Sequence, residues 1–141
     1  MKYTGGCMND CIFCKILKGE LPCMKIYEDE RTMAFLDIAK DVDGHILVIP
    51  KKHVTNILDA DGETLSHVMN TVKKIGAHLT ENCGYEGMNI LNANNECSGQ
   101  TVFHLHIHII PRKRGDGVAG FPKFAGAKIP LEEMCERLKM D

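Results

Sequence analysis

Three histidines alternate with apolar residues in the C-terminal half of this chain, and this alternation constrains the fold more than any other feature. The stretch reads His104-Leu105-His106-Ile107-His108-Ile109-Ile110. On a β-strand alternate side chains point to the same face, so the imidazoles share one face and the apolar residues between them pack into a core on the other. Neighbouring histidine Cα atoms then lie roughly 6.6–7 Å apart, which leaves room for a phosphorus atom or a metal ion among the side chains. Packing does not require such a polar face, so the stretch is predicted to be functional.

The length and charge of the chain favour a single domain. With 141 residues, we expect one domain over 1–141, with a core at about 11–111 and a C-terminal tail at 112–141. The formal net charge is −2, so no nucleic-acid-binding surface is expected. Any phosphate must then be bound by a local site and not by the field of the whole protein.

The chain shows no sequence signal for a membrane or for export. No apolar run approaches the length of a membrane span, and the N-terminus lacks the apolar core of a signal peptide. We therefore expect a cytoplasmic protein with no membrane partner. The seven cysteines, an odd number at uneven spacing, favour reduced thiols over a disulfide framework.

Hydrophobic periodicity predicts an α+β fold. Short apolar runs with β-branched residues indicate strands, whereas apolar residues at helical spacing indicate one long helix. The expected strands are 24–28, 31–37, 45–49, 88–92 and 102–110, and the expected helices are 11–17, 61–79 and a short one after Pro130. Because the strands come as hairpins around the long helix, a mainly antiparallel sheet is predicted.

A glycine-containing turn precedes the histidines. Gly99 permits unusual backbone angles and the close approach of a ligand. Gln100 adds an amide and Thr101 a hydroxyl, and such groups together with backbone N–H donors suit phosphate oxygens. Taken alone, the turn is better interpreted as an ordinary entry into a strand, and only its position before the histidines makes it part of a predicted site.

These motifs resemble the histidine triad (HIT) family of nucleotide hydrolases and transferases, and in particular its bacterial type with an N-terminal Cys-x-x-Cys. The signature of that family is His-x-His-x-His followed by two apolar residues. Matching segments in family order are 11–16, 34–38, 44–53 and 99–110. The resemblance implies a five-stranded, mainly antiparallel sheet with one long helix, and a homodimer in which the sheet continues into a second copy.

The resemblance also implies a reaction. His106 would attack the α-phosphorus of a purine nucleoside phosphoramidate or related nucleotide conjugate, form a covalent nucleotidyl-histidine and release a nucleoside monophosphate after hydrolysis. His108 would donate to the phosphate oxygens, and His104 would orient its neighbour. Thr101 would assist the leaving group, and His45 would reach the same pocket.

Further residues match the substrate contacts of the family. Asp37 would hold the ribose hydroxyls. The apolar residues that match the base-binding positions are Ile12, Phe13, Ile16, Phe35, Ile38 and Leu47, although each could equally be a core residue. The chain departs from the family pattern at Ala93 and Asn95, so a contact from Asn92 or from Asn94 stays open.

A zinc site is the cofactor that the resemblance implies. Cys11 and Cys14 supply two of the four ligands that structural zinc needs. In the family the matching positions of His53 and His104 complete the set. The competing interpretation treats the two cysteines as small apolar residues under the sheet. Cys7 adds a spacing typical of [4Fe–4S] radical enzymes, but the chain is too short for their barrel.

Two other functions compete with the nucleotidyl-histidine hydrolase. In the first, His104, His106 and His108 hold a catalytic metal that activates water. Three alternating positions on a strand span about 13 Å, however, which is too far for all three to bind one ion. In the second, the chain binds nucleotides without turnover.

Overall fold

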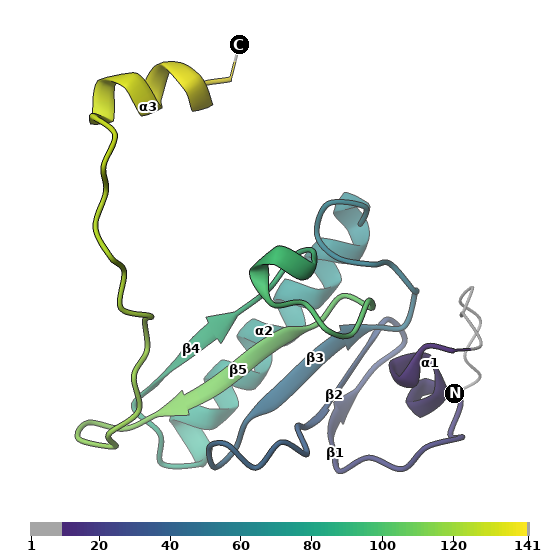
Figure 1. Ribbon diagram of the computed structural model, residues 1–141. Coiled ribbons are helices and arrows are strands. Elements are labelled where there is room, and N and C mark those ends of the chain that lie inside the picture. Colours follow the sequence, from purple (N-terminus) through teal and green to yellow (C-terminus); the bar gives the residue numbers. More distant parts are fainter. Residues whose placement is uncertain (1–9, 141) are drawn as a thin grey trace.

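The computed structural model describes residues 10–140 and shows a five-stranded antiparallel sheet flanked by helices (Figure 1). The strand order is β1-β2-β3-β5-β4, and every neighbouring pair is antiparallel. The strands are β1 (Lys25–Glu28), β2 (Thr32–Leu36), β3 (Ile46–Pro50), β4 (Gly87–Leu91) and β5 (Ile107–Arg112). The helices are α1 (Ile12–Leu17), α2 (Gly62–Asn82) and α3 (Leu131–Leu138). The predicted α+β class is confirmed.

Helix α2 covers one face of the sheet. Asp61 caps its N-terminus through a side-chain contact with the Thr64 backbone N–H. The buried stripe that the sequence predicts packs onto the sheet at Val68, Val72, Ile75 and Leu79. The helix runs to Asn82, three residues beyond the predicted end, because the chain turns only at Gly84, whose φ is +77°.

The opposite face of the sheet carries a smaller apolar cluster beneath α1. Its buried members are Phe13, Met33, Phe35, Leu47 and Ile49. These residues alternate along β2 and β3 with Ala34, Ile46 and Val48, which belong to the core under α2. The sheet is therefore buried on both faces. Helix α1 covers the face opposite α2, and the histidines point to this same face.

The histidine stretch is only partly a strand, so the prediction of a strand over 102–110 is wrong at its beginning. β5 starts at Ile107, and residues 101–106 form a loop that leads into it. β3 ends at Pro50, and the Leu105 N–H donates instead to the carbonyl of Val54 in the loop after β3. The alternation persists in the loop, since Leu105 and Ile107 are both buried in the core under α2.

The C-terminal tail leaves the sheet after β5. Residues 113–116 form a turn that folds back on Arg112, which donates to Asp116 and to the carbonyl of Val118. The chain then runs out to α3, which stands away from the sheet with no buried residue (Figure 1). The predicted helix after Pro130 is confirmed, with Pro130 at its N-cap. No helix within 10–140 is long and apolar enough to cross a membrane. Cys7 lies outside the described residues.

Candidate active site

The middle histidine of the triad is fixed by the backbone of its own loop. Nδ1 of His106 lies 2.7 Å from the carbonyl oxygen of His104. A carbonyl only accepts, so Nδ1 carries the proton and Nε2 of a neutral ring keeps its lone pair. Burial lowers the pKa of His106, which keeps the ring neutral. The loop thus presents an uncharged imidazole with Nε2 free to act as a nucleophile.

The third histidine is the end of a hydrogen-bond chain made of Asp41, His45 and His108. Oδ1 of Asp41 lies 2.8 Å from Nδ1 of His45, and Nε2 of His45 lies 2.8 Å from Nδ1 of His108. His45 is 7% exposed. Burial is the main cause that lowers the pKa of His108 to about 4. The sequence predicts His45 in this pocket, but no motif points to Asp41.

The first histidine of the triad turns away from the other two, into a cluster of Cys11, Cys14, His53 and His104 (the Cys/His cluster). Nε2 of His104 donates to the carbonyl of Pro50 at 2.9 Å, so Nδ1 of the neutral ring faces the cluster with a lone pair. Burial lowers the pKa of His104 to about 4. The four ligand atoms of the cluster all lie within 4.8 Å of one another.

The distances within the Cys/His cluster match a tetrahedral zinc site. Nδ1 of His104 lies 3.5 Å from Sγ of Cys11, 3.6 Å from Sγ of Cys14 and 3.1 Å from Nδ1 of His53. Sγ of Cys14 lies 3.4 Å from Nδ1 of His53. With ordinary Zn–N and Zn–S bond lengths, the ligand atoms of a regular tetrahedron are separated by about 3.3–3.8 Å. The distances therefore fit the group that the sequence implies. Cys14 is disulfide-bonded in this structure, against the expectation of reduced thiols, so zinc binding requires its reduction to the thiolate.

The loop before the histidines is braced by Gln100 and two asparagines. The Gln100 side chain is 3% exposed. Its oxygen accepts from the Asn56 amide and the Asn95 backbone N–H, and its NH₂ donates to the carbonyls of Thr55 and Val102. The sequence predicts a phosphate contact for Gln100, whereas the structure uses both ends of this amide to hold the loop. Gly99 completes the turn with a φ of +100°.

The two candidate asparagines have different surroundings. The Asn92 NH₂ donates at 3.0 Å to the carbonyl oxygen of His106. Asn94 accepts from the Ile57 backbone N–H and donates to the oxygen of Asn92. Asn92 is thus the one in direct contact with the central histidine, and Asn94 holds Asn92 in place.

The six predicted base-binding residues separate into two groups. Phe13, Phe35 and Leu47 are buried in the apolar cluster beneath α1. Phe13 also meets the rings of His104 and His106 edge-on, with ring centroids 5.9 Å and 5.2 Å away. The more accessible members are Ile12 at 45% exposed, Ile38 at 88% exposed and Ile16, which packs against the cluster. A bound base would meet the second group first.

Asp37 faces His45. One of its oxygens accepts from the Ala39 backbone N–H, and the other lies 3.6 Å from Nε2 of His45. The carboxylate therefore lies beside the hydrogen-bond chain of Asp41, His45 and His108.

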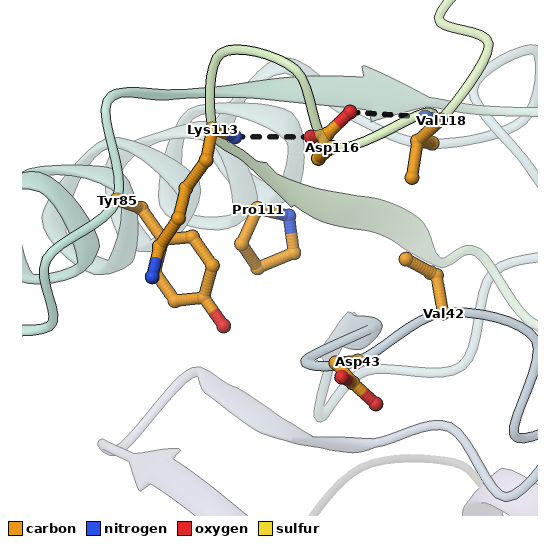
Figure 2. A pocket seen from close by; sticks show the side chains of 7 residues that line it. All are labelled: Val42, Asp43, Tyr85, Pro111, Lys113, Asp116 and Val118. Atoms are coloured by element: carbon orange, nitrogen blue, oxygen red, sulfur yellow. Dashed lines mark hydrogen bonds between the residues drawn. The ribbon is translucent and has the colours of Figure 1, made fainter.

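The described residues form a cavity beside the Cys/His cluster and another around Tyr85 and Pro111. A cavity of about 270 Å³ adjoins the Cys/His cluster and contains Thr101, the predicted assistant of the leaving group, in its wall. Its lining residues are Asp10, Cys11, Ile12, His53, Thr101, Val102 and Phe103. Figure 2 shows a second cavity, of about 230 Å³, where Lys113 lies over the ring of Tyr85 beside Pro111. No triad histidine lines either cavity.

Comparison with known proteins agrees with the geometry. A model of the HIT domain matches residues 18–115. The adenosine 5′-monophosphoramidase hnt1 of Schizosaccharomyces pombe is 42% identical over 131 residues, which cover 91% of this chain and 95% of that protein. The structure of SMU.412c from Streptococcus mutans has a TM-score of 0.83 and 41% identity, covering 94% of this chain and 83% of the other. A zinc-bound histidine triad family protein from Mycobacterium smegmatis has a TM-score of 0.73 and 37% identity, covering 78% and 80%. The chain therefore belongs to the HIT domain family.

Proposed function

We propose that this chain hydrolyses purine nucleoside phosphoramidates or related nucleotide conjugates through a covalent nucleotidyl-histidine on His106. The observation that carries the proposal is the hydrogen bond from Nδ1 of His106 to the carbonyl of His104, at 2.7 Å. It fixes the tautomer in which Nε2 is the nucleophilic nitrogen. The relative from S. pombe is named for an adenosine 5′-monophosphoramidase activity, which supports an amine as the leaving group.

We assign a residue to each step of the reaction. Nε2 of His106 attacks the α-phosphorus, and the amine leaves with the electron pair of its bond to phosphorus. His108, whose ring centroid lies 4.9 Å from that of His106, donates to the phosphate or the leaving group. Asn92 holds the backbone of His106 during the attack. Water then cleaves the nucleotidyl-histidine and releases the nucleoside monophosphate.

The substrate-binding roles remain predictions of the same proposal. Asp37 accepts from the ribose hydroxyls, and the accessible side chains Ile12, Ile16 and Ile38 contact the base. Gly99 brings its backbone close to phosphate, and Thr101 assists the leaving group. Gln100 acts through the shape of the loop, because its amide is already bonded at both ends.

We further propose that the Cys/His cluster holds a structural zinc ion. Its Cys₂His₂ donor set and its distances fit zinc, and a zinc-bound member of the family is known from M. smegmatis. When bound, zinc would supply no chemistry to the substrate and would tie α1 to the loop that carries His104. The predicted homodimer, with the sheet continued into a second copy, and the cytoplasmic location belong to the same proposal.

The three triad rings point in directions that do not fit the competing metallohydrolase hypothesis. His104 faces the Cys/His cluster, His106 is bonded to a backbone carbonyl, and His108 is bonded to His45. Three rings with three separate partners do not converge on one catalytic metal.

One experiment separates the candidate functions. The protein is mixed with an adenosine phosphoramidate, quenched and assayed for an acid-labile nucleotidyl adduct, in parallel with His106→Ala. We expect an adduct in the wild type, none in the variant, and activity that survives a chelator as long as the protein stays folded. Loss of activity on chelation without any adduct would favour the metallohydrolase. Nucleotide binding without turnover would leave only the binding function.

A further inference from the structure

We propose that Asp41 is a positioning residue that, through His45, controls which ring nitrogen of His108 carries a proton and thereby makes His108 the general acid for an amine leaving group. The inference rests on the proposed function and adds to it a residue outside the triad. It arises from the hydrogen-bond chain of Asp41, His45 and His108.

The geometry of this chain is continuous. Both contacts, from Asp41 to His45 and from His45 to His108, measure 2.8 Å. The loop brings Asp41 under His45 by adopting positive φ at two places, Lys40 at 55° and Gly44 at 79°. The His45 ring is buried, and these two partners supply a hydrogen bond to each of its two nitrogens.

The chain has two protonation states with different consequences at its far end. A carboxylate only accepts, so Nδ1 of His45 always donates to Asp41. In a neutral chain Nε2 of His45 must accept, His108 donates from Nδ1, and Nε2 of His108 is bare. With one more proton, both ring nitrogens of His45 are protonated. Nδ1 of His108 then becomes the acceptor, and Nε2 of His108 becomes an N–H donor. A single proton therefore converts His108 from a group that can only accept into an acid.

Two carboxylates lie beside the His45 end of the hydrogen-bond chain. Asp41 and Asp37 both face His45, at 2.8 Å and 3.6 Å. His106, the other ring beside His108, is bonded through Nδ1 to the carbonyl of His104. Burial also lowers the pKa of the His108 ring, which favours its neutral form. In the proposal the extra proton of the chain therefore lies on His45, next to the two carboxylates.

The reaction step balances as follows. The lone pair of His106 Nε2 forms the bond to phosphorus, and the P–N bond breaks with its electron pair going to the amine. The amine takes the proton from Nε2 of His108. Nδ1 of His108 takes the proton from Nε2 of His45, and His45 returns to its neutral form with Nδ1–H on Asp41. The positive charge lost by the chain appears on the new nucleotidyl-imidazolium, so the total charge is unchanged.

The test compares Asp41→Asn with Asp43→Asn, an exposed residue of the same loop. Both variants remove one negative charge, and the asparagine at 41 can still accept from His45. Each is assayed on an adenosine phosphoramidate of an alkyl amine and on the p-nitrophenyl ester of the same nucleotide, whose leaving group departs without a proton. For Asp41→Asn we expect about a tenfold loss of kcat/KM on the amide and less than about a twofold loss on the ester. Equal losses on both substrates, or the same selective loss in Asp43→Asn, would overturn the proposal.

The pH dependence of kcat/KM is a second test of the proposal. Removing the carboxylate weakens proton binding by the chain, so the alkaline limb of kcat/KM on the amide should move to lower pH by about one unit in Asp41→Asn. An unmoved limb would contradict the proposal.

A measurement without substrate separates this inference from the proposed function. In ¹⁵N-histidine-labelled protein, Nε2 of His108 should be bare at high pH and protonated at lower pH, with a lower midpoint in Asp41→Asn than in the wild type. A nitrogen that stays protonated at every pH, or equal midpoints, would refute the role of Asp41. If the wild type turned over neither substrate, the proposed function would fail while this titration still decided the protonation chain.

Discussion

Nδ1 of His106 donates to the backbone carbonyl of His104 across 2.7 Å, so one triad residue sets the tautomer of the next through the main chain and not through its ring. This frees the His104 ring to face the Cys/His cluster. The same six-residue loop can therefore serve a reactive site on one side and a metal site on the other. Both the reactive site and the Cys/His cluster therefore depend on the conformation of the loop 101–106.

Asn92 contacts this loop at the nucleophile itself, through its 3.0 Å hydrogen bond to the His106 carbonyl. We expect Asn92→Ala to lower kcat/KM by about tenfold and the free energy of unfolding by about 1 kcal/mol, since one hydrogen bond is lost. Steady-state kinetics and urea unfolding measure the two effects. Asn70→Ala, on the exposed side of α2, is the control. Unchanged kinetics in Asn92→Ala would show that the carbonyl contact does not position the nucleophile.

Gln100 should matter more for stability than for substrate binding. Gln100→Ala leaves the donor of Asn56 and the carbonyl of Thr55 without their buried partner, and unpaired buried groups are costly. We expect a loss of about 3 kcal/mol in urea unfolding. Gln100→Glu should be destabilised in the same direction, because an oxygen then faces two carbonyls. A fully stable Gln100→Ala with a raised KM would instead support a direct phosphate contact.

The sheet, the long helix and the triad could be predicted from the sequence because each depends on a local pattern. The alternation around His106 forces Leu105 and Ile107 into the core even where the strand is interrupted. The start of β5 could not be predicted, since it depends on where β3 ends at Pro50 and on the contact of Leu105 with Val54. The alternation of residues within one strand does not show how long the neighbouring strand is.

The roles of polar residues were harder to predict than their proximity to the site. Gln100 lies in a recognisable motif, yet its amide points inward, because the loop that it braces comes from distant residues such as Asn56. Asp41 lies in a polar loop with no motif, and only the fold of that loop brings it onto His45. Such roles follow from side-chain direction, which sequence spacing does not determine outside regular elements.

The Cys/His cluster predicts about one zinc ion per chain. His53→Ala removes a ligand and should lower the zinc content of the purified protein to well below half, with a matching fall in the unfolding temperature. Cys97→Ser is the control, because Cys97 is exposed and outside the cluster. Elemental analysis and thermal unfolding check both. A wild-type protein without zinc after purification from zinc-supplemented medium would argue that the two cysteines are packing residues.

The buried triad should make the fold sensitive to acid. The pKa of His108 is lowered to about 4, whereas in the unfolded chain a histidine titrates near pH 6.5. Between these values the unfolded chain binds a proton that the native side chain does not, so the free energy of unfolding falls as the pH falls from about 6.5 to 4. His108→Gln removes this contribution and should flatten the dependence by less than about 1.4 kcal/mol per pH unit, because the side chain is partly screened by solvent. Urea unfolding at several pH values, with the exposed His78→Gln as control, measures the slopes. Parallel slopes in the wild type and His108→Gln would mean that His108 gains its proton equally well in the folded protein.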